Sequence, residues 1–231
     1  METIKDFIIK TGLDLGFRLT ESQIEKFFIY LTELKKWNKK INLTAIKDDR
    51  LIIIKLFLES LAFTYEFPPP FPPPQGRRVR EGVKNILDIG TGAGFPGIPI
   101  KIIHPEISFT LLDSSKKKVA FLKHICRQLD LSGIECIAER AEDVAKQEKY
   151  KGYFDVVLSK GVAEIKNLLK VSFPLLKSNG LFITQKGDDL EIELKDAEEE
   201  MKKDKWVVKN IMKINNPIFG RKFRLITIQI G

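Results

Sequence analysis

The chain has 231 residues, of which 43% are hydrophobic, so it can bury a core of its own, and a disordered protein is excluded. Its 39 lysines and arginines outnumber its 31 aspartates and glutamates, and the net charge of +8 favours an anionic partner, nucleic acid before a membrane surface. Two cysteines, Cys126 and Cys136, form no C-x-x-C pair, so we expect neither a metal site nor a disulfide framework.

The N-terminal stretch "METIKDFIIK" lacks the basic start and the long apolar run of a signal peptide. The most apolar stretch, residues 51–63, contains Lys55 and Glu59 and is too short to span a bilayer. We therefore expect a cytoplasmic protein without membrane contacts, and a monomer.

Residues 1–65 are expected to be helical. Thr20 and Gln23 have the spacing of a capping box, and residues 51–65 predict a further amphipathic helix. Between them, apolar residues that recur three or four positions apart predict one buried helical face, made of Ile24, Phe27, Phe28, Leu31, Leu34 and Trp37.

Residues 66–84 are expected to be a linker. Six of the eleven prolines fall within residues 68–74, and such a tract is stiff, solvated and unable to join the interior of a helix or sheet. It predicts a rigid surface loop, with a ligand for a proline-binding module as the alternative.

Residues 85–231 are expected to form an α/β domain that makes one compact unit with the helices. Apolar runs predict strands alternating with helices, an order typical of a parallel, doubly wound sheet. A charged helix and two hairpin strands at the sheet edge should follow. We expect strands at 85–90, 107–113, 134–139, 153–159, 180–187, 205–214 and 222–230, and helices at 95–104, 115–131, 164–176 and 188–204.

The stretch "NILDIGTGAGFPGIP" carries four glycines directly after the first strand. Read from Gly92 it matches the dinucleotide motif G-x-G-x-x-G, and read from Gly90 it is G-x-G-x-G preceded by Asp88. Pro96 removes a backbone N–H that would bind phosphate, and Asp88 would repel phosphate. Both departures favour S-adenosylmethionine, a sulfonium without phosphate, so Asp88, Gly90, Gly92 and Gly94 are candidate cofactor residues.

Asp113 ends the second strand, where an acid can accept hydrogen bonds from both ribose hydroxyls of a nucleoside or can cap the next helix. Neither His104 nor His124 is placed for hydride transfer. These features and the terminal hairpin predict a class I methyltransferase. Its fold class is α/β, with a Rossmann-like, mostly parallel sheet and an N-terminal helical extension.

Four segments in order resemble the RsmG family, also called GidB: "KWNKKINLT", "LDIGTGAGFPGIPI", "TLLDSSKKKVAFLK" and "ERAEDV". The resemblance covers almost the whole chain. It implies a bacterial S-adenosylmethionine-dependent methyltransferase acting on guanine N7 in small-subunit rRNA, at guanine 527 in the 530 loop. It also implies that the cofactor is lined by Gly90, Phe95, Ala141, Glu142 and Lys160.

The chain departs from this family at two places. The family usually has arginine where "LSKGVA" has Lys160, and His-x-x-Asp-Ser where "LFLES" has Leu56 and Glu59. Lysine keeps the charge but loses the planar fork, and Leu56 cannot make a polar contact. The proline tract is also unusual for the family.

Guanine N7 carries a lone pair and no proton, so its methylation needs alignment and no general base. We therefore assign no catalytic residue. Lys160 could touch the cofactor carboxylate or an RNA phosphate. The expected contacts to rRNA phosphates come from Lys36, Lys39, Lys40, Arg77, Arg78, Lys186, Arg221, Lys222 and Arg224.

Three alternatives stay open. They are a small-molecule methyltransferase of the same fold, a non-catalytic RNA-binding protein with a degenerate site, and an NAD-linked oxidoreductase. Lys160 and Leu56 favour the second, whereas Pro96 and Asp88 disfavour the third. Whether naked rRNA or an assembling small subunit is the substrate also stays open.

Overall fold

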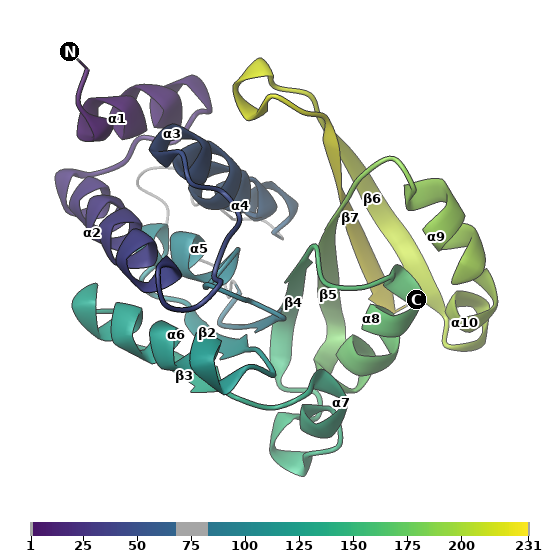
Figure 1. The fold of residues 1–231 in the computed structure, drawn as a ribbon. Coiled ribbons are helices and arrows are strands. Elements are labelled where there is room, and N and C mark those ends of the chain that lie inside the picture. The colour runs from purple at the N-terminus through teal and green to yellow at the C-terminus, as the bar shows by residue number, and fades with distance from the viewer. Residues whose placement is uncertain (1, 68–82, 231) are drawn as a thin grey trace.

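A seven-stranded sheet forms the centre of the computed structural model, which describes residues 2–67 and 83–230 (Figure 1). The strand order is β3-β2-β1-β4-β5-β7-β6, with β1 to β5 parallel and β7 antiparallel to both β5 and β6. The predicted parallel sheet with a terminal hairpin is therefore confirmed. The strands are β1 Asn85–Ile89, β2 Ser108–Leu112, β3 Ile134–Ile137, β4 Phe154–Lys160, β5 Leu176–Lys186, β6 Trp206–Ile214 and β7 Phe223–Ile230.

The helices before the sheet are α1 Ile4–Asp14, α2 Glu21–Asn38 and a continuous helical segment over residues 49–66. That segment comprises α3 Asp49–Ile52, the π-helical turn η1 Ile53–Leu58, α4 Glu59–Leu61 and the 3-10 turn η2 Ala62–Glu66. The predicted capping box is confirmed, because the Gln23 N–H donates to Thr20 Oγ1 and the Thr20 N–H donates to Gln23 Oε1.

The remaining helices follow the strands, as the alternating pattern predicts. The predicted helix over 164–176 ends at Ser172, since Pro174 cannot continue it, and the charged helix over 188–204 is divided in two at Ala197. The elements are α5 Gly97–Ile103, α6 Lys116–Gln128, α7 Ala141–Val144, α8 Ile165–Ser172, α9 Leu190–Asp196 and α10 Glu198–Lys203, with 3-10 turns η3 Glu148–Tyr150, η4 Phe173–Leu175 and η5 Pro217–Phe219.

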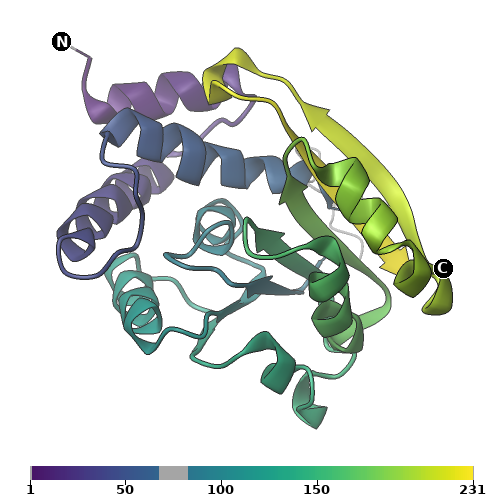
Figure 2. The same ribbon diagram turned by 45° about the vertical axis from the view of Figure 1, so that its right-hand side comes forward.

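The sheet separates two hydrophobic cores (Figure 2). Successive residues of a strand point to opposite faces, so Ile86 packs with α2, α5 and α6 while Leu87 packs with α8. Phe27 and Phe57 of the N-terminal helices belong to the same core as Ile86. Those helices therefore cover one face of the sheet.

Part of the sequence lies outside the described residues. This part includes the proline tract and two of the arginines predicted to bind RNA, Arg77 and Arg78. Within residues 2–67 and 83–230, no helix is both long and apolar enough to cross a bilayer.

Candidate active site

A pocket of about 400 Å³ lies where β1, β4 and β5 end. The carboxyl ends of parallel strands meet at one edge of an open α/β sheet, which is where such sheets bind ligands. A larger hollow of about 660 Å³ lies between α6 and the edge strand β3, away from these strand ends. The smaller pocket brings together six of the predicted residues: Gly90, Gly92, Phe95, Lys160, Lys186 and Arg221.

The loop after β1 needs glycine for two different reasons. Gly92 has φ +61°, and a Cβ there would meet only the Gly90 carbonyl oxygen, at 3.9 Å, so backbone conformation and not space selects glycine. Gly94 has φ +100°, and a Cβ there would overlap Ile98 and lie 2.6 Å from the Tyr30 hydroxyl. The first glycine leaves the pocket open, and the second lets α2 pack against the loop.

Asp88 is buried beneath the loop and does not line the pocket. Its side chain is fully buried, and its Oδ2 accepts hydrogen bonds from Thr91 Oγ1 at 2.7 Å and from the Gly97 N–H at 2.8 Å. Among the described residues its Oδ1 has no partner. Burial raises the pKa of Asp88 to about 7, against the opposing effect of these hydrogen bonds. Its hydrogen bonds therefore fix the shape of the loop.

Asp113 joins the glycine loop to α6. Its Oδ2 accepts from the Gly92 N–H at 3.0 Å, and its Oδ1 accepts from the Ser115 N–H at 2.9 Å. Ser115, and not Asp113, is the N-cap of α6. Ala141 and Glu142 begin α7 after β3, and neither lines the pocket of about 400 Å³.

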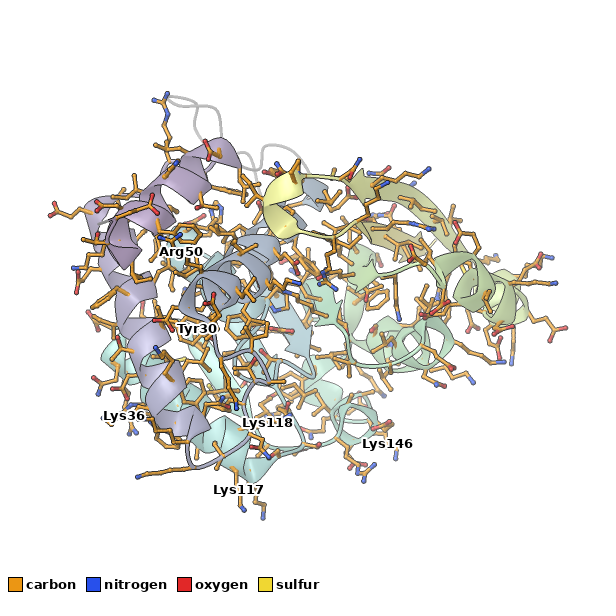
Figure 3. The ribbon with its side chains drawn as sticks, turned by 45° about the horizontal axis from the view of Figure 1, so that its top comes forward. Tyr30, Lys36, Arg50, Lys117, Lys118 and Lys146 are labelled. Carbon is orange, nitrogen blue, oxygen red and sulfur yellow. The ribbon has the colours of Figure 1, made fainter. Side chains whose placement is uncertain are left out.

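Tyr30 of α2, labelled in Figure 3, packs behind the glycine loop and does not itself line the pocket. Its hydroxyl donates a hydrogen bond to the Ala93 carbonyl, and its ring stacks on Phe95 at 5.3 Å and on Phe57 at 5.0 Å between centroids. Tyr30 is fully buried, and Phe95 is 8% exposed. The sequence signal for Tyr30 was its position three residues after Phe27, on the face predicted to be buried.

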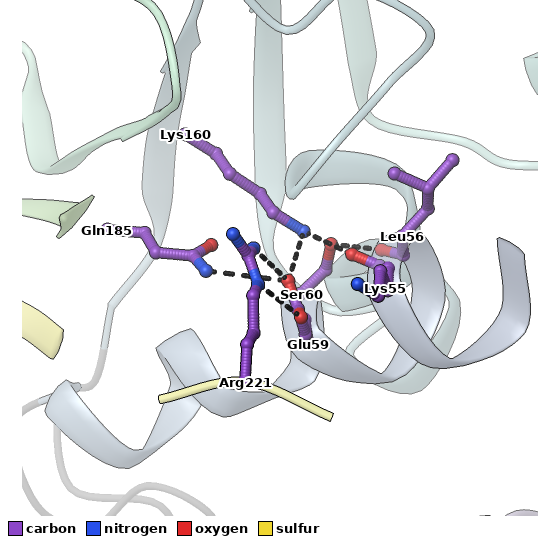
Figure 4. A network of polar contacts seen from close by, with 7 residues as sticks. All are labelled: Lys55, Leu56, Glu59, Ser60, Lys160, Gln185 and Arg221. Atoms are coloured by element: carbon purple, nitrogen blue, oxygen red, sulfur yellow. Dashed lines mark hydrogen bonds and ion pairs between the residues drawn. The ribbon is translucent and has the colours of Figure 1, made fainter. Parts of the chain in front are cut away.

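The two departures from the family meet at a buried carboxylate (Figure 4). Glu59 is fully buried, and Arg221 grips both of its oxygens, with Nε at 3.1 Å and Nη2 at 2.7 Å. Lys160 Nζ lies 3.5 Å from Glu59 and donates to the Lys55 carbonyl at 2.7 Å. Gln185 Nε2 lies 3.4 Å from the same carboxylate. Glu59 therefore ties its helix to β4, β5 and the turn before β7.

Lys160 is the last residue of β4, and its side chain is only 11% exposed. Burial lowers its pKa to about 8, while the charge of Glu59 acts in the opposite direction. The Arg221 side chain is 47% exposed and lines the pocket. Of the two cations that contact Glu59, Arg221 is therefore the one that reaches the pocket mouth. Leu56 supplies an apolar part of the pocket wall.

Most cations predicted to bind RNA on the β5 and β7 side already have carboxylate partners. Lys186 donates to Glu193 at 2.7 Å, and Arg224 pairs with Glu191. Lys222 is exposed beside them. On α2, Lys36 pairs with Glu33 at 3.3 Å, whereas Lys39 and Lys40, just after the helix, are exposed.

The sheet order, the glycine loop after β1 and the pocket at the strand ends define a class I S-adenosylmethionine-dependent methyltransferase. Solved structures share this fold. A putative caffeoyl-CoA O-methyltransferase from Staphylococcus aureus matches with a TM-score of 0.54 and 16% identity, over 97% of this chain and 98% of that one. The Bacillus subtilis tRNA methyltransferase TrmK matches with a TM-score of 0.57 and 14% identity, over 77% and 68%. At these identities the likeness concerns the fold alone.

The family model described as rRNA small subunit methyltransferase G matches residues 23–222. Proteins named ribosomal RNA small subunit methyltransferase G are 35% identical in Thermoanaerobacter pseudethanolicus, over 97% of this chain and 89% of the relative, and 41% identical in Clostridium botulinum, over 84% and 76%. This chain belongs to the rRNA small subunit methyltransferase G family. The predicted resemblance and the interpretation as an enzyme are confirmed, and the NAD-linked oxidoreductase is excluded.

Proposed function

We propose that the protein transfers the methyl group of S-adenosylmethionine to N7 of a guanine in small-subunit rRNA, at guanine 527 of the 530 loop. The observation that supports this proposal most is the composition of the pocket, which has a glycine loop on one side and the Arg221 guanidinium on the other. The first suits a nucleoside cofactor, and the second suits the acceptor atoms of a purine or a phosphate. We propose that the enzyme acts in the cytoplasm, where rRNA is assembled.

The residues around the loop fit S-adenosylmethionine. The buried carboxylates of Asp88 and Asp113 flank the loop, and Asp113 occupies the Gly92 N–H, which a phosphate ligand would need. A cationic sulfonium is tolerated beside these carboxylates. We propose as cofactor residues Gly90, Gly92, Gly94, Phe95, Asp113, Ala141, Glu142 and Lys160, with Asp88 shaping the loop.

S-adenosylmethionine supplies an electrophilic methyl group, and guanine N7 has a free lone pair, so no proton must be removed before transfer. The protein's task is alignment of the base and exclusion of water. Phe95, Leu56 and Phe223 supply apolar walls for a purine ring. Because methylation makes the base cationic, the Glu59 carboxylate also lowers the positive potential that Arg221 and Lys160 would otherwise create there.

Calorimetry is expected to show binding of S-adenosylmethionine or its demethylated product and no binding of NAD. Gly92→Val should weaken cofactor binding about tenfold or more, because a left-handed backbone costs a side chain about 1–2 kcal/mol and reshapes the loop. Gly152→Val is the matched control. Gly152 has φ +58°, and a Cβ there would also meet only a carbonyl oxygen at 3.9 Å. It differs from Gly92 in its position, because it lies before the first residue of β4, whereas the pocket lies at the last.

The control variant should lose similar stability and keep its cofactor affinity. Comparable affinity for NAD, or equal loss of cofactor binding in both variants, would contradict the assignment. Transfer of radiolabelled methyl groups from the cofactor to purified small-subunit rRNA then tests the acceptor. Transfer to no RNA would leave the small-molecule methyltransferase as the better function.

A further inference from the structure

The end of α2 and the first turn of α6 lie at the same place on the surface. Glu33 is 2.5 Å from His124, and the Trp37 ring is 5.6 Å from the Phe121 ring. Because later residues of α2 meet earlier residues of α6, the two helices run antiparallel. The residues just after α2 therefore lie beside the beginning of α6, which starts at Lys116.

Four lysines gather there, and Figure 3 shows the first turn of α6, with Lys117, beside the end of α2. Lys39, Lys40, Lys116 and Lys117 are all exposed, and none of them has an ion pair within residues 2–67 and 83–230. We call these four residues the basic rim.

Helix stability does not account for the two lysines that begin α6. The first turn of α6 contains no acidic residue, so Lys116 and Lys117 lie at the positive end of the helix dipole, which disfavours cations. A cation at that end of a helix costs stability unless an anion compensates it. A ligand with negative charge accounts for Lys116 and Lys117, whereas Lys39 and Lys40, just after the C-terminal end of α2, suit that helix's dipole as well as an anion.

The basic rim lies next to the pocket of about 400 Å³. Lys118, the next residue of α6, has its Nζ 3.7 Å from Asp113 Oδ2, the same oxygen that accepts from the Gly92 N–H. Leu43, three residues after Lys40, lines the pocket. A polyanion bound along the basic rim would therefore pass the pocket mouth on the side of the glycine loop.

The cations on the other side of the pocket are less available. Lys186, Arg221 and Arg224 each donate to a carboxylate, as described above. A cation that is already paired gains less from a phosphate, because its charge is compensated before the phosphate arrives. Among the described residues, the basic rim therefore offers unpaired positive charge beside the pocket, as does Lys222 on the other side.

We propose that the basic rim binds the sugar–phosphate backbone of the rRNA next to the guanine that enters the pocket. This inference rests on the proposed function and adds the face on which the RNA docks. Contacts to phosphates fix position and orientation without reading sequence. The basic rim should therefore set affinity for RNA and its salt dependence, while the cofactor binds without it.

Charge reversal tests this assignment in the full-length enzyme. The variants are Lys39→Glu with Lys40→Glu, and Lys116→Glu with Lys117→Glu. The control is Lys203→Glu with Lys209→Glu, two exposed lysines without ion pairs among the described residues, on α10 and β6. The order of the strands puts β6 at the opposite edge from β3, on which α6 packs. All three double variants change the net charge equally.

Each rim variant is expected to bind small-subunit rRNA about tenfold more weakly than the control at low salt. The slope of the logarithm of the binding constant against the logarithm of the salt concentration should be shallower by about 2, because two phosphate contacts are lost. The KM for rRNA should rise, whereas kcat at saturating RNA and affinity for S-adenosylhomocysteine should not change.

Rim variants that bind rRNA as tightly as the control would overturn the inference, even if the wild type methylates rRNA. A loss of S-adenosylhomocysteine affinity that equals the loss for RNA would also overturn it, because the lysines would then serve the cofactor. A wild-type enzyme that neither binds nor methylates rRNA would instead disprove the proposed function.

Discussion

Glu59→Gln is expected to lower the free energy of unfolding by about 3–5 kcal/mol, the cost of removing one partner of a buried ion pair. The variant removes the negative charge that faces Lys160 and the bidentate ion pair with Arg221. Methyl transfer should fall at least about tenfold, since a contact of about 1.4 kcal/mol positions Arg221 at the pocket. Denaturant unfolding and methyl transfer at a permissive temperature measure the two effects.

The stability deficit of Glu59→Gln should shrink as the pH rises. Burial lowers the pKa of Lys160 in the fold from its ordinary value of 10.5 to about 8. Protonated Lys160 therefore destabilises the fold below pH 8, and this penalty is relieved between pH 8 and 10.5. Loss of the Glu59 charge lowers this pKa further, so relief begins at lower pH. The deficit should therefore be larger at pH 7 than at pH 9.

Glu66→Gln is the matched control for the charge. Glu66 is another buried carboxylate, but its partners, Asn210 and Thr227, are neutral. Glu66→Gln should lower the free energy of unfolding by less than Glu59→Gln does, and this loss should not shrink between pH 7 and 9. Methyl transfer should be unchanged. Equal effects of the two variants would show that Glu59 acts as any buried acid does.

Tyr30→Ala is expected to destabilise the protein by about 3–5 kcal/mol, because it empties a fully buried aromatic site between Phe57 and Phe95. Tyr30→Phe keeps the stacking and leaves the Ala93 carbonyl without its donor, at a cost of about 1–2 kcal/mol. Since Ala93 belongs to the pocket, Tyr30→Phe should also weaken cofactor binding, measured by calorimetry.

Tyr65→Phe is the control for Tyr30→Phe, because it also removes a tyrosine hydroxyl that donates to a backbone carbonyl, but away from the glycine loop. The Tyr65 hydroxyl donates to the Leu15 carbonyl at 2.9 Å, and neither residue lines the pocket. This variant should bind the cofactor as the wild type does. Cofactor affinity that is unchanged in Tyr30→Phe would remove Tyr30 from the site and leave it a core residue.

The features predictable from the sequence are those set by local pattern. The apolar runs predicted the seven strands, with the first five in parallel and the last two as a hairpin, and Thr20 with Gln23 predicted the start of α2. The glycine loop was predictable because backbone positions with positive φ favour glycine, so several such positions close together appear in the sequence as a run of closely spaced glycines.

Contacts between distant residues were not predictable in this way. Glu59 and Lys160 stood out separately as departures from the family, but nothing local shows that they pair with each other or with Arg221. Asp88 was expected to face the ligand, yet the two-residue period of β1 directs it to the same face as Ile86, under the start of α5. Tyr30 reaches the loop only after α2 has packed.

Mapping N7-methylguanine in small-subunit rRNA from cells with the gene, without it, and with the gene restored shows whether this protein methylates that rRNA. One N7-methylguanine should disappear without the gene and return with the wild-type protein. Glu59→Gln should restore it poorly. An unchanged set of N7-methylguanines in cells without the gene would show that this protein does not methylate guanine N7 in that rRNA.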